Sequence, residues 1–395
     1  MSPAMQALRH AAVDWRLMLM GAVLVAIGII FHVLSDGIFL SPENLYNIAQ
    51  QTAVVGIVST VVVLVIVARH IDLSVGSVMG FVGVLVAYLQ YTAGWSWPAA
   101  CLAGLAVAIL VSLYQGSLTA VLGVPSFVVT LGGLMSFRGA AFLVADGKTQ
   151  PVSDDFFLSL GGGYDGSIGV TASWVLAGVV AAVLLLLLAN KRRVQRSYGV
   201  PGNALWLDAL LVAVPIAIVC GFVAAMNAYQ IPNKSAPQGV PIPVLIWAAV
   251  ALILSFIVKR TRFGRYVFAM GGNPDAAALV GIPVRKVTLM LFVLLAVLIT
   301  IAAIVSVARL NAGTNSLGTG MELYVIAAAV IGGTALAGGS GSILGSVLGA
   351  LIMQSLDSGM LLLDVSIGKR MVIIGQVLIA AVVFDVLYRR WTGEQ

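Results

Sequence analysis

A succession of long apolar runs, joined by short polar connections, dominates this sequence. A helix of about 20 mainly apolar residues crosses roughly 30 Å of hydrocarbon. We read about twelve such spans, give or take about two. They are 15–34, 45–69, 75–92, 98–122, 127–145, 170–190, 204–229, 241–258, 287–309, 321–337, 341–357 and 368–388. The sequence therefore predicts an all-α polytopic membrane protein with about ten to twelve transmembrane helices in one domain, 1–395.

Some of these spans have features of broken or re-entrant helices. The run 75–92 and the pair 321–337 and 341–357 contain many glycines, and the pair is joined by a short connection. Non-helical backbone is tolerated at membrane depth only inside protein or beside water. The expected number of complete spans is therefore a range.

The composition supports a protein whose solvent is the lipid bilayer. Hydrophobic residues make up 61% of the chain and charged residues only 9%, against about 25% charged in a soluble domain. Cys101 and Cys220 lie inside apolar runs, and the three histidines have no ligand spacing. We expect neither a disulfide framework nor a metal site.

The positive charges predict an orientation. Cytoplasmic loops of membrane proteins carry an excess of Lys and Arg, and an even number of spans places both termini on one side. With both termini cytoplasmic, the inner side collects Arg9, Arg16, Arg69, Lys191, Arg192, Arg193, Arg196, Lys259, Arg260, Arg262, Arg265, Arg285, Lys286, Arg389 and Arg390. The outer side collects Lys148, Lys234, Arg309, Lys369 and Arg370. The net charge of +6 is thus an orientation signal, and nucleic-acid binding is not expected.

A short helix is predicted inside the basic loop 260–286. Asn273 suits an N-cap, Pro274 the first helical position, and Asp275 the first turn, where the helix dipole favours an anion. Gly281 can end the helix in the left-handed conformation. A helix of about two turns is marginal in water, so it must be held by tertiary contacts or by a partner.

The residues alone leave two readings of this helix open. It is either a connector lying against the membrane or a docking element for a soluble subunit. The flanking basic residues would hold its ends near anionic headgroups or an acidic partner; they are Arg260, Arg262, Arg265, Arg285 and Lys286.

Four long motifs resemble one family of transporters. They are "HIDLSVGSVMG" (70–80), "VPSFVVTLGGLMSFRG" (124–139), "FGRYVFAMGGNPDAAALVGI" (263–282) and "VIGGTALAGGSGSILGSVLGALI" (330–352). The chain resembles, over essentially its whole length, the permease subunits of the ribose/xylose family of ATP-binding-cassette (ABC) sugar importers. "SLDSGMLLLDV" (355–365) and the apolar material around 170–230 are most similar to the D-xylose transporters of that family.

The resemblance implies a function and a set of partners. A monosaccharide, D-xylose on this resemblance, would pass from periplasm to cytoplasm across the bacterial inner membrane by alternating access. Two permease copies, expected to be a homodimer, would associate with cytoplasmic ATPase subunits that bind ATP and Mg²⁺, and with a periplasmic sugar-binding protein. The chain itself would bind no cofactor and would not be an enzyme. Its "DGKT" (146–149) lacks the first glycine of a P-loop, because that position is Phe142.

The resemblance also assigns residues. It implies that 272–282 form the coupling helix, which sits in a groove of the ATPase. The residues that carry this role are Gly272, Asn273, Pro274, Asp275, Ala276, Leu279, Gly281 and Ile282; Asp275 stands where many relatives have Glu.

For several other residues the sequence leaves more than one role open. Gln50, Gln51 and Thr52 are uncharged hydrogen-bonding groups that suit a sugar pathway or interhelical hydrogen bonds. Arg138 falls within a span and must meet a carboxylate, carbonyl groups or pathway water. A row of glycines offers small-xxx-small faces for packing within the protomer or for a dimer seam or gate; it is Gly341, Gly345 and Gly349.

A rival function is an ion-coupled secondary sugar transporter, and a passive channel is a third. The rival needs deep carboxylates that face one another, whereas Asp72, Glu322 and Asp357 read as lying near the ends of spans. For Asp72 we expect pairing with Arg69 or capping of the helix that begins with "LSVGS".

Overall fold

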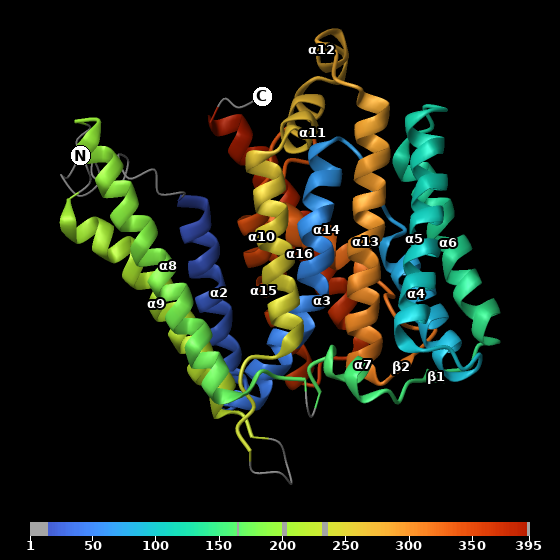
Figure 1. The fold of residues 1–395 in the computed structure, drawn as a ribbon, viewed down its shortest axis with the longest axis horizontal. Coiled ribbons are helices and arrows are strands. Elements are labelled where there is room, and N and C mark those ends of the chain that lie inside the picture. Colours follow the sequence, from blue (N-terminus) through green and yellow to red (C-terminus); the bar gives the residue numbers. More distant parts are fainter. Residues whose placement is uncertain (1–14, 164–165, 200–203, 231–235, 393–395) are drawn as a thin grey trace.

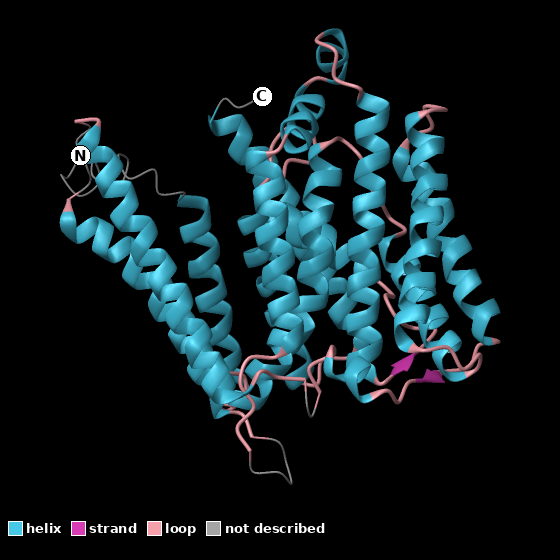
Figure 2. Ribbon diagram, in the orientation of Figure 1, coloured by secondary structure: helices cyan, strands magenta, loops and turns pink. Residues whose placement is uncertain are grey.

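The protein is a bundle of helices with one pair of very short strands (Figures 1 and 2). The computed structural model describes residues 15–163, 166–199, 204–230 and 236–392. The helices are α2 (Trp15–Leu34), α3 (Pro42–Val67), α4 (Val75–Tyr91), α5 (Trp97–Ala120), α6 (Ser126–Ala145), α7 (Asp155–Ser159), α8 (Gly169–Ser197), α9 (Leu205–Ala228), α10 (Ile242–Arg260), α11 (Arg262–Gly272), α12 (Pro274–Leu279), α13 (Val284–Leu310), α14 (Met321–Ile331), α15 (Ile343–Leu362) and α16 (Ile367–Thr392). The strands are β1 (Gln150–Pro151) and β2 (Ala312–Gly313), paired antiparallel.

Ten helices of the described chain are long and apolar enough to cross a membrane. Two further apolar helices, α4 and α14, are shorter. The all-α polytopic fold and the range of about ten to twelve spans are therefore confirmed. The expected span 321–337 is a helix only over its first part, because α14 ends at Ile331.

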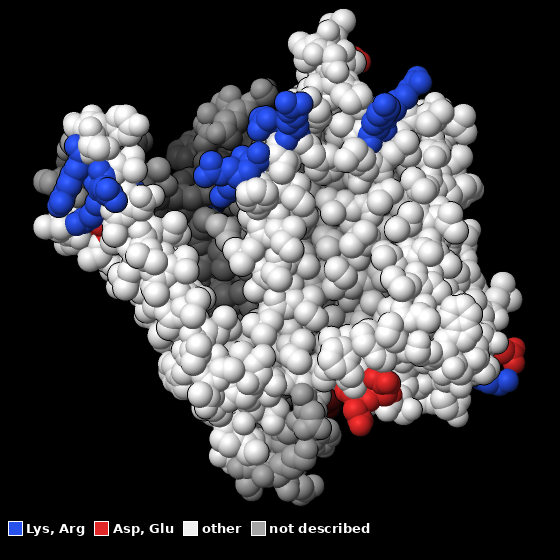
Figure 3. Space-filling model, viewed as in Figure 1, with Lys and Arg blue, Asp and Glu red and all other residues white. Residues whose placement is uncertain are grey.

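The bundle has two faces, which we name by the elements on them. The α12 face carries α12, the start of α2 and the end of α16; the β face, opposite, carries β1 and β2 (Figure 1). In the view of Figure 3, Lys and Arg gather along the α12 face, whereas Asp and Glu appear mainly at the β face. Arg9 and Lys234, which the sequence places on opposite sides, lie outside the described residues.

Three helices form the centre of the bundle. The most apolar stretch of α3 is 94% buried and those of α13 and α15 are each 67% buried, against 11% for each of α8 and α9. A helix that is apolar all round must be buried in protein or lipid. The three central helices are therefore enclosed mainly by protein, and α8 and α9 present their apolar surface to lipid.

The α8–α9 hairpin leans to one side of the bundle (Figure 1). Near its turn, Arg192 Nε lies 2.9 Å from Asp208 Oδ2, and Lys191 lies 3.6 Å from Oδ1. At its other end, the Tyr229 ring stacks on Tyr46 of α3, with centroids 4.5 Å apart. Asp208 is only 1% exposed, so paired charges close the hairpin where an unpaired carboxylate would be costly.

The crossing that follows α13 consists of a non-helical half, in which residues 315–320 form turns, and a helical half, α14. Gly313 lies against Ala87 and Gly318 against Gly76 of α4, so this stretch of chain spans about 16 Å along the helix at 1.5 Å per residue. The 11 residues of α14 add about 16 Å. Together they match the roughly 30 Å of hydrocarbon, and α14 begins halfway across.

Glycines in α15 let two helices touch backbone to backbone. A Cβ at Gly345 would overlap the Gly332 carbonyl at the end of α14, and one at Gly349 would overlap the Ala328 carbonyl. Gly341, just before α15, lies against Val67. Such small residues permit close helix approach in lipid.

Replacing Gly349 with valine is therefore expected to destabilise the protein. Overpacking of this kind costs about 1–3 kcal/mol, which should appear as a lower thermal unfolding midpoint of the purified protein. Gly375→Val is the matched control, because a Cβ at Gly375 of α16 meets nothing within 4 Å. Equal midpoints for the two variants would contradict this account of the α14–α15 contact.

Candidate functional site

Helix α12 has the ends that its sequence predicts. Asn273 Oδ1 accepts a hydrogen bond from Ala276 N at 3.0 Å, and Pro274 opens the helix with Asp275 in the first turn. Gly281 has φ +86° and donates from its N–H to Ala278 O at 3.0 Å. The predicted helix, its N-cap and its glycine stop are confirmed. Its role as a coupling element stays a prediction.

The helix stands out from the bundle with an apolar tip (Figure 1). Leu279 is 88% exposed and Val280 is 78% exposed, whereas Ala277 is buried. Gly272, Asn273, Asp275 and Ala276 are also exposed, as is Gly281. Figure 3 shows blue clusters near the base of this projection. The residues that the sequence places in its basic surroundings are all exposed; they are Arg260, Arg262, Arg265, Arg285 and Lys286.

Helix α11, which precedes α12, was not predicted as a separate element. The Thr261 side chain accepts from Gly264 N at 3.3 Å and caps it. Its buried residues include Val267 and Met270, while Arg262 and Arg265 are exposed. The signal was available: apolar residues recur at helical spacing between arginines. From the sequence we predicted only a basic loop in this stretch.

A junction forms where α11 meets α12. A Cβ at Gly271 would overlap the Val67 carbonyl at the end of α3. Gly339, in the connection between α14 and α15, donates its N–H to that same carbonyl at 2.9 Å. The base of the α12 projection thus touches both the central helix α3 and the α14–α15 connection.

Arg69 joins the parts of this junction. Its Nε donates to Gly271 O at 2.7 Å and its Nη2 donates to Gly272 O at 2.6 Å. Its backbone is left-handed, with φ +64°. The side chain of Arg69 bonds these two carbonyls and does not form the expected pair with Asp72. The other expectation holds, because Asp72 Oδ1 accepts from Ser74 N and Ser74 Oγ, both at 2.7 Å, at the start of α4.

A polar groove of about 310 Å³ lies beside the junction. Arg69 and His70 line it from the α3–α4 connection, and Thr119 and Ser126 line it from α5 and α6. Burial lowers the pKa of His70, so its imidazole is neutral at pH 7. The groove opens on the α12 face.

The three uncharged residues of α3 have separate partners. Gln51 Oε1 accepts from Gln354 Nε2 of α15 at 2.7 Å. Gln50 donates to Gly162 O, and Thr52 Oγ1 donates to Ile48 O within α3 at 2.6 Å. The structure therefore spreads these side chains over different contacts instead of gathering them on one surface, which is the geometry of interhelical and intrahelical hydrogen bonding.

Arg138 reaches the non-helical half of the α13–α14 crossing. Its Nη1 donates to Asn315 O at 3.0 Å and to Leu317 O at 2.8 Å. Glu322, in the first turn of α14, attracts it electrostatically. Carbonyl groups, one of the three expected partners of Arg138, are thus its hydrogen-bond partners.

The carboxylates of the rival transporter do not gather. Asp72 caps α4, and Asp357 accepts from Tyr324 OH at 3.0 Å and lies 3.4 Å from Arg370. The expectation that these groups lie near the membrane ends of spans is wrong for Glu322 and for Asp72, because α14 and α4 both begin about halfway across the bundle, where Gly318 meets Gly76. The neighbour of Glu322 is the cation Arg138, and the described contacts show no carboxylate pair of the kind a shared-proton relay needs.

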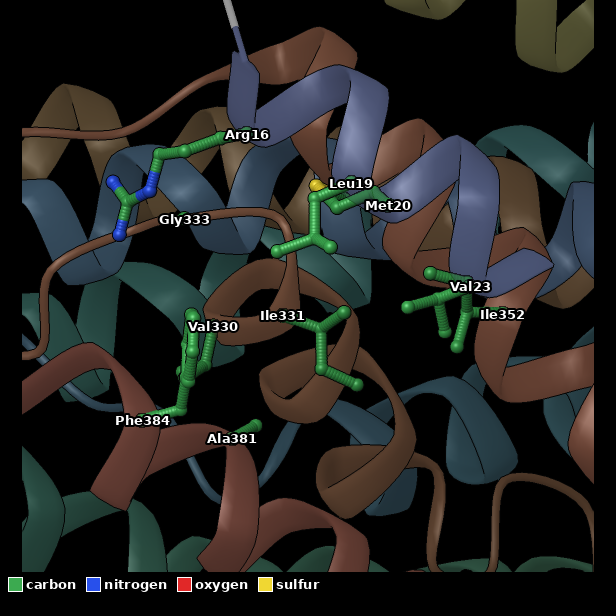
Figure 4. A pocket seen from close by; sticks show the side chains of 10 residues that line it. All are labelled: Arg16, Leu19, Met20, Val23, Val330, Ile331, Gly333, Ile352, Ala381 and Phe384. Carbon is green, nitrogen blue, oxygen red and sulfur yellow. The ribbon is translucent and has the colours of Figure 1, made fainter. Parts of the chain in front are cut away.

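A further cavity, of about 170 Å³, opens between α2, α14, α15 and α16 (Figure 4). Figure 4 shows Arg16 reaching toward Gly333 at one end, while Leu19, Val23, Ile331 and other apolar side chains line the rest. Apart from Arg16 at one end, the lining side chains are apolar.

The fold and this site define a class of protein: a multi-pass membrane permease with a projecting helix on its basic face. The chain belongs to a permease family, since the family model described as "Branched-chain amino acid transport system / permease component" matches residues 44–382.

Curated relatives of known transport role match nearly the whole chain. The xylose transport system permease protein XylH of Haemophilus influenzae is 39% identical over 368 residues, 92% of this chain and 95% of its own length. XylH of Escherichia coli K12 is 34% identical over 96% of this chain and 94% of its own length. The ribose import permease protein RbsC of the same strain is 32% identical over 92% and 91%. No solved structure matches significantly.

Proposed function

We propose that this chain is the transmembrane permease of an ATP-driven ABC importer for a monosaccharide, D-xylose in the first place. The observation that carries the proposal is the exposed, capped helix α12 with its apolar tip, Leu279 and Val280. A secondary transporter or a channel has no use for such a projection. The xylose permeases among the relatives support the sugar, and the ribose permease is the alternative to test.

Under this proposal, each partner binds at one of the two faces of the bundle. The α12 face, rich in Lys and Arg (Figure 3), would be cytoplasmic by the positive-inside rule. Both termini would then be cytoplasmic and the membrane would be the bacterial inner membrane. ATPase subunits, which hold ATP and Mg²⁺, would dock on α12. A sugar-binding protein would deliver the substrate to the β face, and a second copy of this chain would complete the pathway.

The junction at Arg69 supplies a path for the motion. When the ATPase pair closes, α12 moves with it. Arg69 and the Gly271–Val67 contact tie the base of α12 to α3, and the Gly339–Val67 hydrogen bond ties α3 to the α14–α15 connection. Rigid elements that slide over small residues suit a two-state rearrangement. A weakly held sugar would then be released inward.

Reconstitution tests this proposal. The permease is incorporated in vesicles with its ATPase and binding protein, and uptake of labelled xylose is followed with ATP on the ATPase side, with and without an ionophore. We expect uptake that requires ATP and is unaffected by the ionophore. Uptake that ignores ATP and collapses with the ion gradient would establish the secondary transporter instead. Excess unlabelled ribose, compared with excess xylose, decides between the two pentoses.

A further inference from the structure

The non-helical half of the α13–α14 crossing, residues 314–320, forms turns at a depth where backbone groups cannot be left unpaired toward lipid. It runs along α4 between the β face and the middle of the bundle, as the contacts of Gly313 and Gly318 show. Non-helical backbone at this depth is found only where it is buried in protein or lines a water-filled space. What each side of this segment contacts therefore indicates whether that side faces protein or water.

One side of the segment is fixed by protein. Leu317 is buried, and Gly318 is in backbone contact with Gly76 of α4. Arg138 donates to the carbonyls of Asn315 and Leu317 from 177 and 179 residues away in the sequence. The unwound backbone is thus held and satisfied from the α4–α6 side.

The other side is open and polar. Ser316 and Thr319 are exposed, and the hydroxyls of Thr314 and Ser316 lie 3.1 Å apart. The carboxylate of Glu322, in the next turn of chain, lies on the protein side instead, with Oε2 buried against Gly76 of α4. Facing lipid, the exposed hydroxyls would be costly. Hydroxyl groups in water, by contrast, can exchange hydrogen bonds with a passing polyol.

A second polar cluster joins three helices. Tyr324 of α14 donates its hydroxyl to Asp357 of α15, and Arg370 of α16 lies beside the same carboxylate. The side chains of Asp357 and Arg370 remain about one-fifth exposed, 20% and 19%. Arg370 is in the first turn of α16, so this cluster belongs to the β-face end of that helix.

We propose that the open side of residues 314–320 lines the water-filled route of the substrate, an uncharged polyhydroxyl compound. Thr314, Ser316 and Thr319 offer hydroxyls as weak, exchangeable partners for its OH groups. Arg138 is the positioning residue that keeps the backbone unwound against α4. The inference rests on the proposed function for the nature of the substrate, but not for the presence of water.

Thiol accessibility tests the water-filled route directly. In a background with Cys101→Ala and Cys220→Ala, Ser316→Cys and Thr319→Cys are assembled with the ATPase in lipid nanodiscs, which expose both faces. A charged, membrane-impermeant methanethiosulfonate reagent is applied with and without ATP. Only the thiolate reacts, so a water-filled route predicts rapid labelling at both positions in at least one nucleotide state.

Met135→Cys is the depth-matched control. Met135 lies on α6 between Gly133, which meets Ser74 at the start of α4, and Arg138, which meets Gly80. It is 71% exposed on an apolar helix. Its labelling should be slower by roughly a hundredfold, because forming a thiolate in hydrocarbon carries the penalty of an intramembrane charge.

Two results would overturn the route. One is labelling at Ser316→Cys and Thr319→Cys no faster than at Met135→Cys in either nucleotide state. The other is a disulfide between the Ser316→Cys positions of two copies without labelling, which would show a dry seam. Neither readout requires transport, so a failure here is distinguishable from a failure of ATP-driven uptake in the reconstituted system.

Discussion

Leu279→Asp is expected to abolish ATP-driven uptake while leaving the permease folded. The side chain is 88% exposed at the tip of α12, so its loss removes no packing within the chain. Burying a leucine against a partner contributes about 1.5–3 kcal/mol, and a carboxylate in its place must also be desolvated. The affinity for the ATPase should fall by roughly tenfold to a hundredfold or more.

Two measurements check this expectation. Binding of the purified ATPase to the nanodisc-embedded permease gives the affinity, and xylose uptake in vesicles gives the transport rate. Leu122→Asp is the matched control, because Leu122 is also exposed, at 70%, in the turn after α5. The control should keep both activities. Unchanged affinity and uptake in Leu279→Asp would make α12 an ordinary connector.

The helices that sequence reasoning located best were those whose signals are local. Apolar runs of about 20 residues set the spans, and α12 carries its own cap, Asn273, and its own stop, Gly281. These features act within a few residues of where they stand. Tertiary contacts had little left to decide, so the predicted and observed boundaries agree closely.

The non-helical half of the α13–α14 crossing could not be predicted from local signals. The polar stretch 314–320 reads as an outer loop, and the following apolar residues read as a complete span. What holds this stretch inside the bundle is Arg138 and the glycine face of α4, both far away in the sequence. The composition of a segment shows that it is polar. It does not show that an arginine far away in the sequence donates hydrogen bonds to its carbonyls.

The candidate site likewise contains features that local sequence signals predict and features that depend on distant contacts. The sequence placed α12 and its exposed residues correctly, because the caps and the glycine are adjacent. Of the two roles it left open for Asp72, the structure shows the capping contact and not the pairing with Arg69. Asp72 is three residues away along the chain, whereas the observed partners Gly271 and Gly272 are 202 and 203 residues away. A left-handed backbone at Arg69 turns the side chain toward them, and no local pattern announced that conformation.

Arg69→Ala is expected to separate ATPase binding from transport. Helix α12 keeps its own caps and its exposed tip, so the ATPase should bind with nearly unchanged affinity. Hydrogen bonds that involve a charged group contribute about 1.5–3 kcal/mol each, and two of them fix the base of α12 to the end of α3. Without them the motion of α12 is absorbed at the junction, and xylose uptake should fall by roughly tenfold or more.

Arg69→Lys sharpens the test, because lysine keeps the charge but not the planar fork that serves two carbonyls at once. It should transport at a level between the wild type and Arg69→Ala. Arg265→Ala, at an exposed position of α11, is the control that should transport normally.

A junction that merely stabilises the fold would lower the unfolding midpoint and the amount of assembled complex together with uptake. A junction that transmits motion leaves the assembled complex intact and still hydrolysing ATP, with few sugars moved per ATP. Equal xylose uptake per ATP in Arg69→Ala and the wild type would rule transmission out.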